Sequence, residues 1–204
     1  MKTVIVRPER CVGCMQCMAA CAVAHSEGKS LYAAVFEEPR TPPRIHVGPG
    51  PGTWAFPNKC RHCDPAPCMA ACMPRALTRD APTGAVLVDP SRCINCGMCA
   101  MACPFGVIRY RADRRAPGRR AVAVKCDNCV DRQKEGQPPA CVETCLVGAL
   151  VFGDPNELLK EESRRLARQV SLGLREAAER PEERPAAVAL WRELGDAADA
   201  VAPP

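Results

Sequence analysis

Cysteine is the residue type in this chain best able to do chemistry, because sixteen cysteines stand at spacings suited to metal binding. The central run, from Cys93 to Pro104, reads C-x2-C-x2-C-x3-C-P. Three of its thiols fall within a short loop and can occupy three corners of one cubane, while the fourth follows a helical turn and usually reaches another cluster. Pro104 then ends the turn, because proline has no backbone N–H to donate. This spacing is typical of ligands to iron–sulfur clusters.

The remaining cysteines form three further groups of four, so that none is left over. The first group repeats the spacing of the central run, the second reads C-x2-C-x4-C-x3-C, and the last reads C-x2-C-x11-C-x3-C. Every group closes with x3-C, which predicts four metal sites with four thiolate ligands each. The sixteen candidate ligands are Cys11, Cys14, Cys17 and Cys21, then Cys60, Cys63, Cys68 and Cys72, then Cys93, Cys96, Cys99 and Cys103, and finally Cys126, Cys129, Cys141 and Cys145.

Disulfide bonds and structural zinc are other common uses of many cysteines, and the sequence favours neither. Disulfide scaffolds belong to short secreted chains, whereas the start of this chain has only four consecutive uncharged residues, Thr3 to Val6, too few for a signal peptide. Structural zinc sites use two separated cysteine pairs rather than closely spaced triplets. We therefore expect a cytoplasmic chain, unless a partner with its own signal carries it across a membrane. Because no run of about 18 apolar residues is present, we expect no direct membrane insertion.

The formal charge of +5 does not predict nucleic-acid binding, because it counts the cysteines as neutral thiols. At about −2 for each oxidised four-cysteine cluster, four clusters bring the charge to about −3. The arginine-rich segment 113–120 is then expected to be a solvated basic turn. A basic residue stands directly before the first cysteine of every group: Arg10, Lys59, Arg92 and Lys125. These cations either offset cluster charge and raise the reduction potential, or are solvated charges at strand ends.

Short strands and helical turns are expected around the cysteine groups. Helical turns are predicted where three groups close, at residues 17–21, 68–72 and 99–103. Strands are predicted at residues 2–6, 31–37, 44–47, 106–110 and 148–152, together with a hairpin of residues 76–79 and 85–88.

The tail has a different character. An N-cap at Asp154 and a stripe of apolar residues predict a helix that ends at Arg180, and a second short helix is expected at residues 186–194. The stripe consists of Leu159, Leu166, Val170, Leu174 and Ala177. These helices either pack on the cluster domain or form a docking arm for a partner subunit.

Three side chains near the second cysteine group are candidates for a role beside a cluster. Trp54 and Phe56 are interpreted as apolar cover for a cluster, with a partner-docking surface as the alternative. His62 lies inside the group, either as a hydrogen-bond donor to cluster sulfur or as a surface-loop histidine.

Catalytic machinery is not evident in the sequence, which has no C-x3-C-x2-C radical-enzyme spacing, no dinucleotide fingerprint and no nucleophile with a base. If every iron has a protein thiolate, no coordination position is open for a substrate. The sequence therefore predicts an electron carrier rather than an enzyme.

The order of the four groups, residues 60–68 and the run from Cys93 to Pro104 resemble the four-cluster ferredoxin-like electron-transfer subunits. These serve dimethyl sulfoxide reductase-type enzymes, formate dehydrogenases, formate hydrogenlyase and aldehyde oxidoreductases. The insertion at residues 31–47 looks most like the iron–sulfur subunit associated with carbon monoxide dehydrogenase. The resemblance covers residues 1–153 and leaves the tail outside. It implies a catalytic oxidoreductase, with carbon monoxide dehydrogenase favoured, and an electron acceptor protein as partners.

The resemblance implies an α+β fold of two bacterial-ferredoxin-like two-cluster units, one inserted in the other, followed by a helical C-terminal extension. Residues 1–153 would form the four-cluster domain, with 60–110 as the inserted unit and 154–204 as the extension. Spacing alone permits sequential or nested pairing of the groups, but the family pairs them in a nested way. That would give four 4Fe-4S clusters, on Cys11, Cys14, Cys17 and Cys145; on Cys126, Cys129, Cys141 and Cys21; on Cys60, Cys63, Cys68 and Cys103; and on Cys93, Cys96, Cys99 and Cys72.

Removal of the clusters is expected to unfold most of the chain. Aromatic residues make up only 4% of the sequence, too few for a large conventional core, and metal–thiolate bonds contribute folding free energy directly. Calorimetry of anaerobically prepared, cluster-free protein checks this expectation. A cooperative thermal transition of normal size in that sample would contradict it.

Overall fold

The computed structural model describes residues 2–50, 52–171 and 186–201. The chain divides into two compact units. The first is made of segments Met1–Cys14, Val47–Pro57 and Cys145–Pro204, and the second of Met15–His46 and Asn58–Thr144. Both combine short antiparallel strand pairs with helices, which confirms the α+β class.

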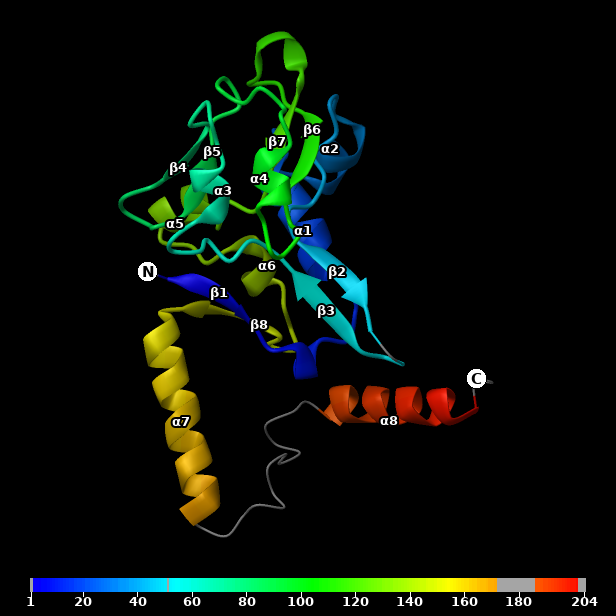
Figure 1. Cartoon of the computed structure of the whole chain (residues 1–204). Coiled ribbons are helices and arrows are strands. Elements are labelled where there is room, and N and C mark those ends of the chain that lie inside the picture. Colours follow the sequence, from blue (N-terminus) through cyan, green and yellow to red (C-terminus); the bar gives the residue numbers. More distant parts are fainter. Residues whose placement is uncertain (1, 51, 172–185, 202–204) are drawn as a thin grey trace. The chain divides into compact units, whose positions relative to one another are not determined.

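A two-stranded sheet in the first unit pairs the strand before the first cysteine group with the strand after the last one. Strand β1 (Thr3–Val6) pairs antiparallel with β8 (Leu150–Gly153), in the register Thr3 to Gly153 and Val6 to Leu150 (Figure 1). Its β-branched residues suit a strand, and the prediction at residues 2–6 is confirmed, whereas β8 begins two residues later than predicted. The first cysteine group follows β1 and Cys145 precedes β8, so the sheet brings both cysteine segments to one end of the unit.

A second strand pair in this unit is β2 (His46–Pro49) with β3 (Ala55–Asn58). The strand predicted at residues 44–47 therefore lies two residues too early. Ala55 of β3 packs with Cys11 and Ala149 in a small buried cluster. Trp54 and Phe56 keep 43% and 41% of their surface exposed, so neither is fully buried cover.

The C-terminal helices α7 (Pro155–Ser171) and α8 (Ala186–Val201) also belong to the first unit. The expected N-cap is present, because Asp154 Oδ1 accepts a hydrogen bond from the Asn156 N–H at 2.9 Å. The rest of the predicted helix, with Leu174, Ala177 and Arg180, lies outside the described residues. Leu159, Leu166 and Val170 are exposed on α7, so its apolar stripe is not packed against the described part of the chain.

Helix α8 is longer than the predicted 186–194 and packs on the segment that leads to the first cysteine group. Buried Arg192 donates from Nη2 to the Cys11 carbonyl at 2.7 Å and to the Pro8 carbonyl at 3.2 Å. Its guanidinium lies 3.9 Å from the centroid of the Trp54 ring. Gly195 allows close approach, because a Cβ there would lie 2.8 Å from the Thr53 nitrogen. For α8, the structure supports packing on the cluster domain.

Two antiparallel hairpins form the sheets of the second unit (Figure 1). The first, β4 (Leu77–Arg79) with β5 (Val86–Val88), confirms the predicted hairpin. The second joins β6 (Arg109–Ala112) to β7 (Ala121–Val124) through the basic turn. Strand β6 begins three residues later than predicted, and β7 was not predicted. Side chains from both hairpins and the residue before β6 share one core with two cysteines: Leu77, Val86, Val122, Ile108, Cys93 and Cys99.

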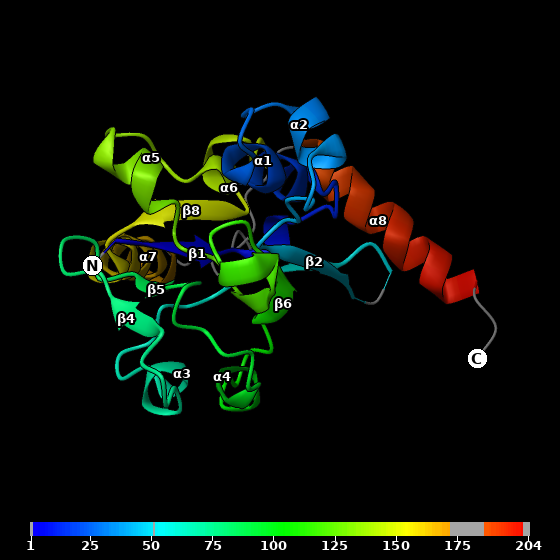
Figure 2. The same ribbon diagram turned by 90° about the horizontal axis from the view of Figure 1, so that it is seen from above.

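Short helices in the second unit follow the cysteine loops. The predicted turns are confirmed as α1 (Gln16–His25), α3 (Pro67–Ala70) and α4 (Met98–Met101), and the last group adds α5 (Val130–Lys134) and α6 (Ala140–Glu143). Helix α1 packs on α6, and α3 packs on α4 (Figure 2). No helix among the described residues is long and apolar enough to cross a membrane.

The strand predicted at residues 31–37 is wrong, because this segment forms helix α2 (Leu31–Phe36). Ser30 acts as its N-cap, with its side-chain oxygen accepting from the Ala33 N–H at 3.1 Å. Two alanines in the centre favour a helix. The β-branched and aromatic residues of the segment misled the prediction, since Tyr32 and Phe36 are exposed on the helix surface.

Candidate metal centres

A left-handed residue shapes the loop between the first two cysteines of every group. The residue before the second cysteine has a positive φ: 70° at Gly13, 52° at His62, 60° at Asn95 and 61° at Asn128. This turn points backbone N–H groups at the first thiol, as the His62 N–H does toward Cys60 Sγ at 3.4 Å and the Asn128 N–H toward Cys126 Sγ at 3.4 Å. Such N–H groups stabilise a thiolate, which is the form that binds metal.

The last cysteine of the first group lies among the cysteines of the last group, within the second unit. Burial raises the pKa of Cys21 to about 12, and repulsion from Cys126 and Cys129 adds to the rise. Burial likewise raises the pKa of Cys141, with repulsion from Cys126 and Cys21 as further causes. The Arg44 N–H donates to Cys21 Sγ at 3.3 Å. Four thiols from two distant groups are thus close enough for their charges to interact.

A small cavity in the second unit is lined by the first three cysteines of the second group and the last of the third. These are Cys60, Cys63, Cys68 and Cys103. Burial raises the pKa of Cys68, and repulsion from Cys60 and Cys103 adds to the rise while the charge of Lys125 opposes it.

The first three cysteines of the third group and the last cysteine of the second group also lie within the second unit. These are Cys93, Cys96, Cys99 and Cys72. Burial raises the pKa of Cys99, a hydrogen bond from Tyr110 opposes the rise, and repulsion from Cys72 adds to it. The Tyr110 hydroxyl lies 3.2 Å from Cys99 Sγ. Backbone N–H groups serve the other thiols, with Ala76 donating to Cys72 Sγ at 3.2 Å and Ala123 to Cys93 Sγ at 3.4 Å.

In the first unit, Cys11 is accompanied by Cys14 and Cys145. Burial raises the pKa of Cys11, the Gly13 N–H opposes the rise, and repulsion from Cys14 and Cys145 adds to it. Cys17 belongs to the second unit, where it lies in the first turn of α1.

The donor set fits iron–sulfur clusters. All sixteen cysteines are free thiols, and an all-sulfur set selects soft metals over cations such as magnesium or calcium. Several of the thiols have raised pKa values because they are buried, so cluster assembly must release protons as the thiolates form.

Two of the four cations before the cysteine groups are buried, which excludes the solvated interpretation for them. Lys59 is 0% and Lys125 is 4% exposed, whereas Arg92 is exposed. Lys125 donates from Nζ to the Val86 carbonyl and, at 3.1 Å, to the Cys126 carbonyl.

Each of the two buried lysines affects the pKa of a cysteine that belongs to a different group from the one it precedes. Lys59 precedes Cys60, yet its charge opposes the burial-driven rise in the pKa of Cys126. Lys125 precedes Cys126, yet its charge opposes the rise at Cys68. Each lysine therefore offsets thiolate charge in the neighbouring set, a relation that sequence order does not reveal.

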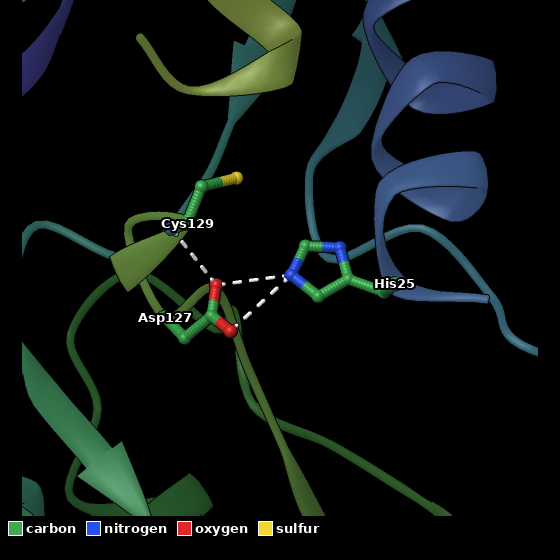
Figure 3. A group of neighbouring side chains, drawn as sticks. All are labelled: His25, Asp127 and Cys129. Atoms are coloured by element: carbon green, nitrogen blue, oxygen red, sulfur yellow. Dashed lines mark hydrogen bonds and ion pairs between the residues drawn. The ribbon is translucent and has the colours of Figure 1, made fainter. Parts of the chain in front are cut away.

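A polar network that the sequence analysis missed supports the loop of the last group (Figure 3). His25 Nε2 donates to Asp127 Oδ1 at 3.0 Å, and Arg44 Nη1 donates to Oδ2 at 2.5 Å. Asp127 in turn accepts from the Cys129 N–H at 3.0 Å. Although burial opposes ionisation, the bond from His25 and the charge of Arg44 hold the pKa of Asp127 below its ordinary range.

The polar atoms of His25, Asp127 and Cys129 lie within 4.8 Å of one another (Figure 3). Because Cys129 is also a candidate cluster ligand, we assign this group a positioning role for the loop rather than a separate metal site. No signal in the sequence could have found it, since His25 lies 102 residues from Asp127.

Known proteins resemble this chain over most of its length. A 4Fe-4S dicluster domain matches residues 53–155 and a 4Fe-4S binding domain matches residues 8–24. An iron–sulfur protein of Rhodospirillum rubrum is 40% identical over 74% of this chain and 81% of its own. The thiosulfate reductase electron transfer subunit PhsB of Salmonella typhi is 36% identical over 90% and 88%. The electron transport protein HydN of Escherichia coli strain K12 is 37% identical over 79% and 94%.

The chain therefore belongs to the 4Fe-4S dicluster family of electron-transfer iron–sulfur proteins. The chain carries more than one 4Fe-4S cluster.

Replacement of Lys125 by glutamine should lower the reduction potential of one cluster more than those of the others. The buried charge offsets thiolate charge near Cys68, so its loss makes an added electron less favourable, by an amount on the order of tens of millivolts. An EPR-monitored redox titration of the cluster-loaded chain measures the shift. The matched control is Arg92→Gln, which removes an exposed charge at the equivalent position. Equal shifts in the two variants, or none in Lys125→Gln, would contradict the assignment.

Proposed function

We propose that this chain carries single electrons between a catalytic oxidoreductase, with carbon monoxide dehydrogenase favoured, and a downstream acceptor, and that it has no catalytic site of its own. When bound, each cluster accepts and releases one electron at a time. The protein residues supply four thiolates for each cluster and offset their charge. The observation that carries the proposal is the gathering of cysteines from distant groups, since a four-thiolate set leaves no iron open to a substrate.

The proposed ligand sets are the nested ones, with residues 60–110 as an inserted two-cluster unit, 1–153 as the whole cluster domain and 154–204 as a helical extension. Interactions of Cys21 with Cys126 and Cys129, of Cys68 with Cys60 and Cys103, and of Cys99 with Cys72 and Cys93 support three sets. Interaction of Cys11 with Cys14 and Cys145 supports the remaining set, to which Cys17 is assigned by the resemblance.

The choice of carbon monoxide dehydrogenase depends on the insertion at residues 31–47. Within it, α2 exposes Tyr32 and Phe36, whose ring centroids are 4.6 Å apart. Exposed aromatic residues are enriched at protein interfaces, so this insertion offers a surface for a partner.

The alternative is an electron-transfer subunit of a formate dehydrogenase, formate hydrogenlyase, aldehyde oxidoreductase or dimethyl sulfoxide reductase-type enzyme. The similarity to the thiosulfate reductase electron transfer subunit spans 90% of the chain and supports a partner other than carbon monoxide dehydrogenase.

An anaerobic mixing experiment tests the partner. Cluster-loaded protein is added to carbon monoxide dehydrogenase under carbon monoxide, and bleaching of the iron–sulfur absorbance is followed. We expect rapid bleaching that needs both the enzyme and the gas. Mixtures that lack the enzyme or the gas are the controls.

Two results would contradict different parts of the proposal. Absence of bleaching in protein that dithionite does reduce would reject carbon monoxide dehydrogenase and leave the electron carrier. Clusters that neither dithionite nor a stronger reductant such as titanium(III) citrate can reduce would count against electron transfer itself.

A further inference from the structure

We infer that His62 donates a hydrogen bond from Nε2–H to the cluster held by Cys60, Cys63, Cys68 and Cys103, and thereby raises the reduction potential of that cluster. The acceptor is a sulfur of the cluster or of its ligands. The inference rests on the proposed ligand set and goes beyond it by naming the residue that tunes one of the four potentials.

The backbone conformation of His62 does not by itself explain why histidine stands at this position. The residue occupies the left-handed site before the second cysteine, with a φ of 52°. The equivalent residues are Gly13, Asn95 and Asn128, and glycine and asparagine are the residues that adopt this conformation most readily. Histidine therefore gives no backbone advantage here, which points to a role for its side chain.

The ring is held in one orientation and one tautomer. His62 is 1% exposed, and its Nδ1 accepts a hydrogen bond from the Val86 N–H of β5 at 3.0 Å. An accepting Nδ1 carries no proton, so the proton of the neutral ring is on Nε2. Strand β5 thus fixes Nε2 as a donor.

This donor needs an acceptor at the cavity. His62 lines the cavity with the four cysteines, and its buried Nε2 has no hydrogen-bond partner among the residues that the structure describes. Lys125, which also lines the cavity, carries only donors on its side chain and cannot accept the proton. Buried donors are nearly always paired, and the acceptors that the cavity offers are the sulfur atoms of the cysteines and of a cluster.

A hydrogen bond to sulfur strengthens when the cluster gains negative charge, so it favours the reduced state. The His62 donor is a neutral N–H group within the cysteine loop, whereas Lys125 acts through its charge. The first and third groups offer no buried side-chain donor at the equivalent position, because Gly13 has no side chain and Asn95 is exposed. We therefore expect the effect of His62 to be confined to one cluster.

Two substitutions separate the functions of the two ring nitrogens. In His62→Asn, the side-chain oxygen can replace Nδ1 as acceptor for Val86, the backbone conformation is well tolerated, and the Nε2 donor is lost. In His62→Gln, the amide N–H can reach the position of Nε2, and the donor is kept. The readout is an EPR-monitored redox titration of the full, cluster-loaded chain, with iron and sulfide content measured for each variant.

We expect His62→Asn to lower the equilibrium constant for reduction of one cluster about tenfold, which for a one-electron couple is about 59 mV. In His62→Gln, the potential of that cluster should remain close to the wild-type value. Unchanged potentials in a fully loaded Asn variant, or equal shifts in both variants, would overturn the inference and leave electron transfer intact. Failure of the wild-type clusters to accept electrons would instead count against the proposed function.

A measurement on the wild-type chain keeps the inference testable if the Asn variant does not assemble. ENDOR spectroscopy of reduced, ¹⁵N-histidine-labelled protein should detect an exchangeable proton and a histidine nitrogen coupled to a cluster. A double variant, His25→Gln with His46→Gln, removes the two other histidines of the chain, so that a coupling which persists there belongs to His62. Absence of any such coupling would overturn the inference.

Discussion

Repulsion between buried thiolates is the interaction on which the rest of this structure depends. Burial raises the pKa of the thiols, and each thiol in a set raises those of the others. The chain offsets this repulsion with hydrogen-bond donors and cations of its own, and bound iron would offset it further. Backbone N–H groups from left-handed loops face the sulfur atoms, Tyr110 lies beside Cys99, and two buried lysines act on neighbouring sets. The fold is in this sense a scaffold for anionic sulfur, with hairpins and short helices that hold N–H groups in place.

The hydrophobic core is small, and it shares residues with the metal sites. Cys93 and Cys99 pack with the hairpin residues of the second unit, and Cys11 packs with Ala55 and Ala149 in the first. Since the same side chains would bind metal and fill the core, cluster assembly and folding are expected to be one process. Helix α8 is tied to the cluster region in the same way, because Arg192 binds the carbonyl of Cys11.

The cysteine pattern allowed the 4Fe-4S cofactor to be predicted, and the resemblance that it carries allowed the α+β class to be predicted. Ligand spacing constrains the backbone over only a few residues. Helical turns at the closing cysteines and the hairpin between the second and third groups were predictable for that reason. Helix α2 was not predicted, because the β-branched and aromatic residues of its sequence are typical of a strand. The N-cap at Ser30 favours the helix instead. The burial of His62, Lys59 and Lys125 and the network of His25, Arg44 and Asp127 depend on contacts between distant segments, which local spacing does not encode.

The central claim is that thiols from distant groups share one cluster, and substitution of Cys21 and Cys141 tests it most directly. Mössbauer and EPR spectra of the cluster-loaded Cys21→Ser, Cys141→Ser and double variants show which cluster each substitution alters. The account predicts that both single substitutions alter the same cluster and that the double variant alters no other, whereas Cys14→Ser alters a different one. Loss or alteration of two clusters in the double variant would contradict the nested sets.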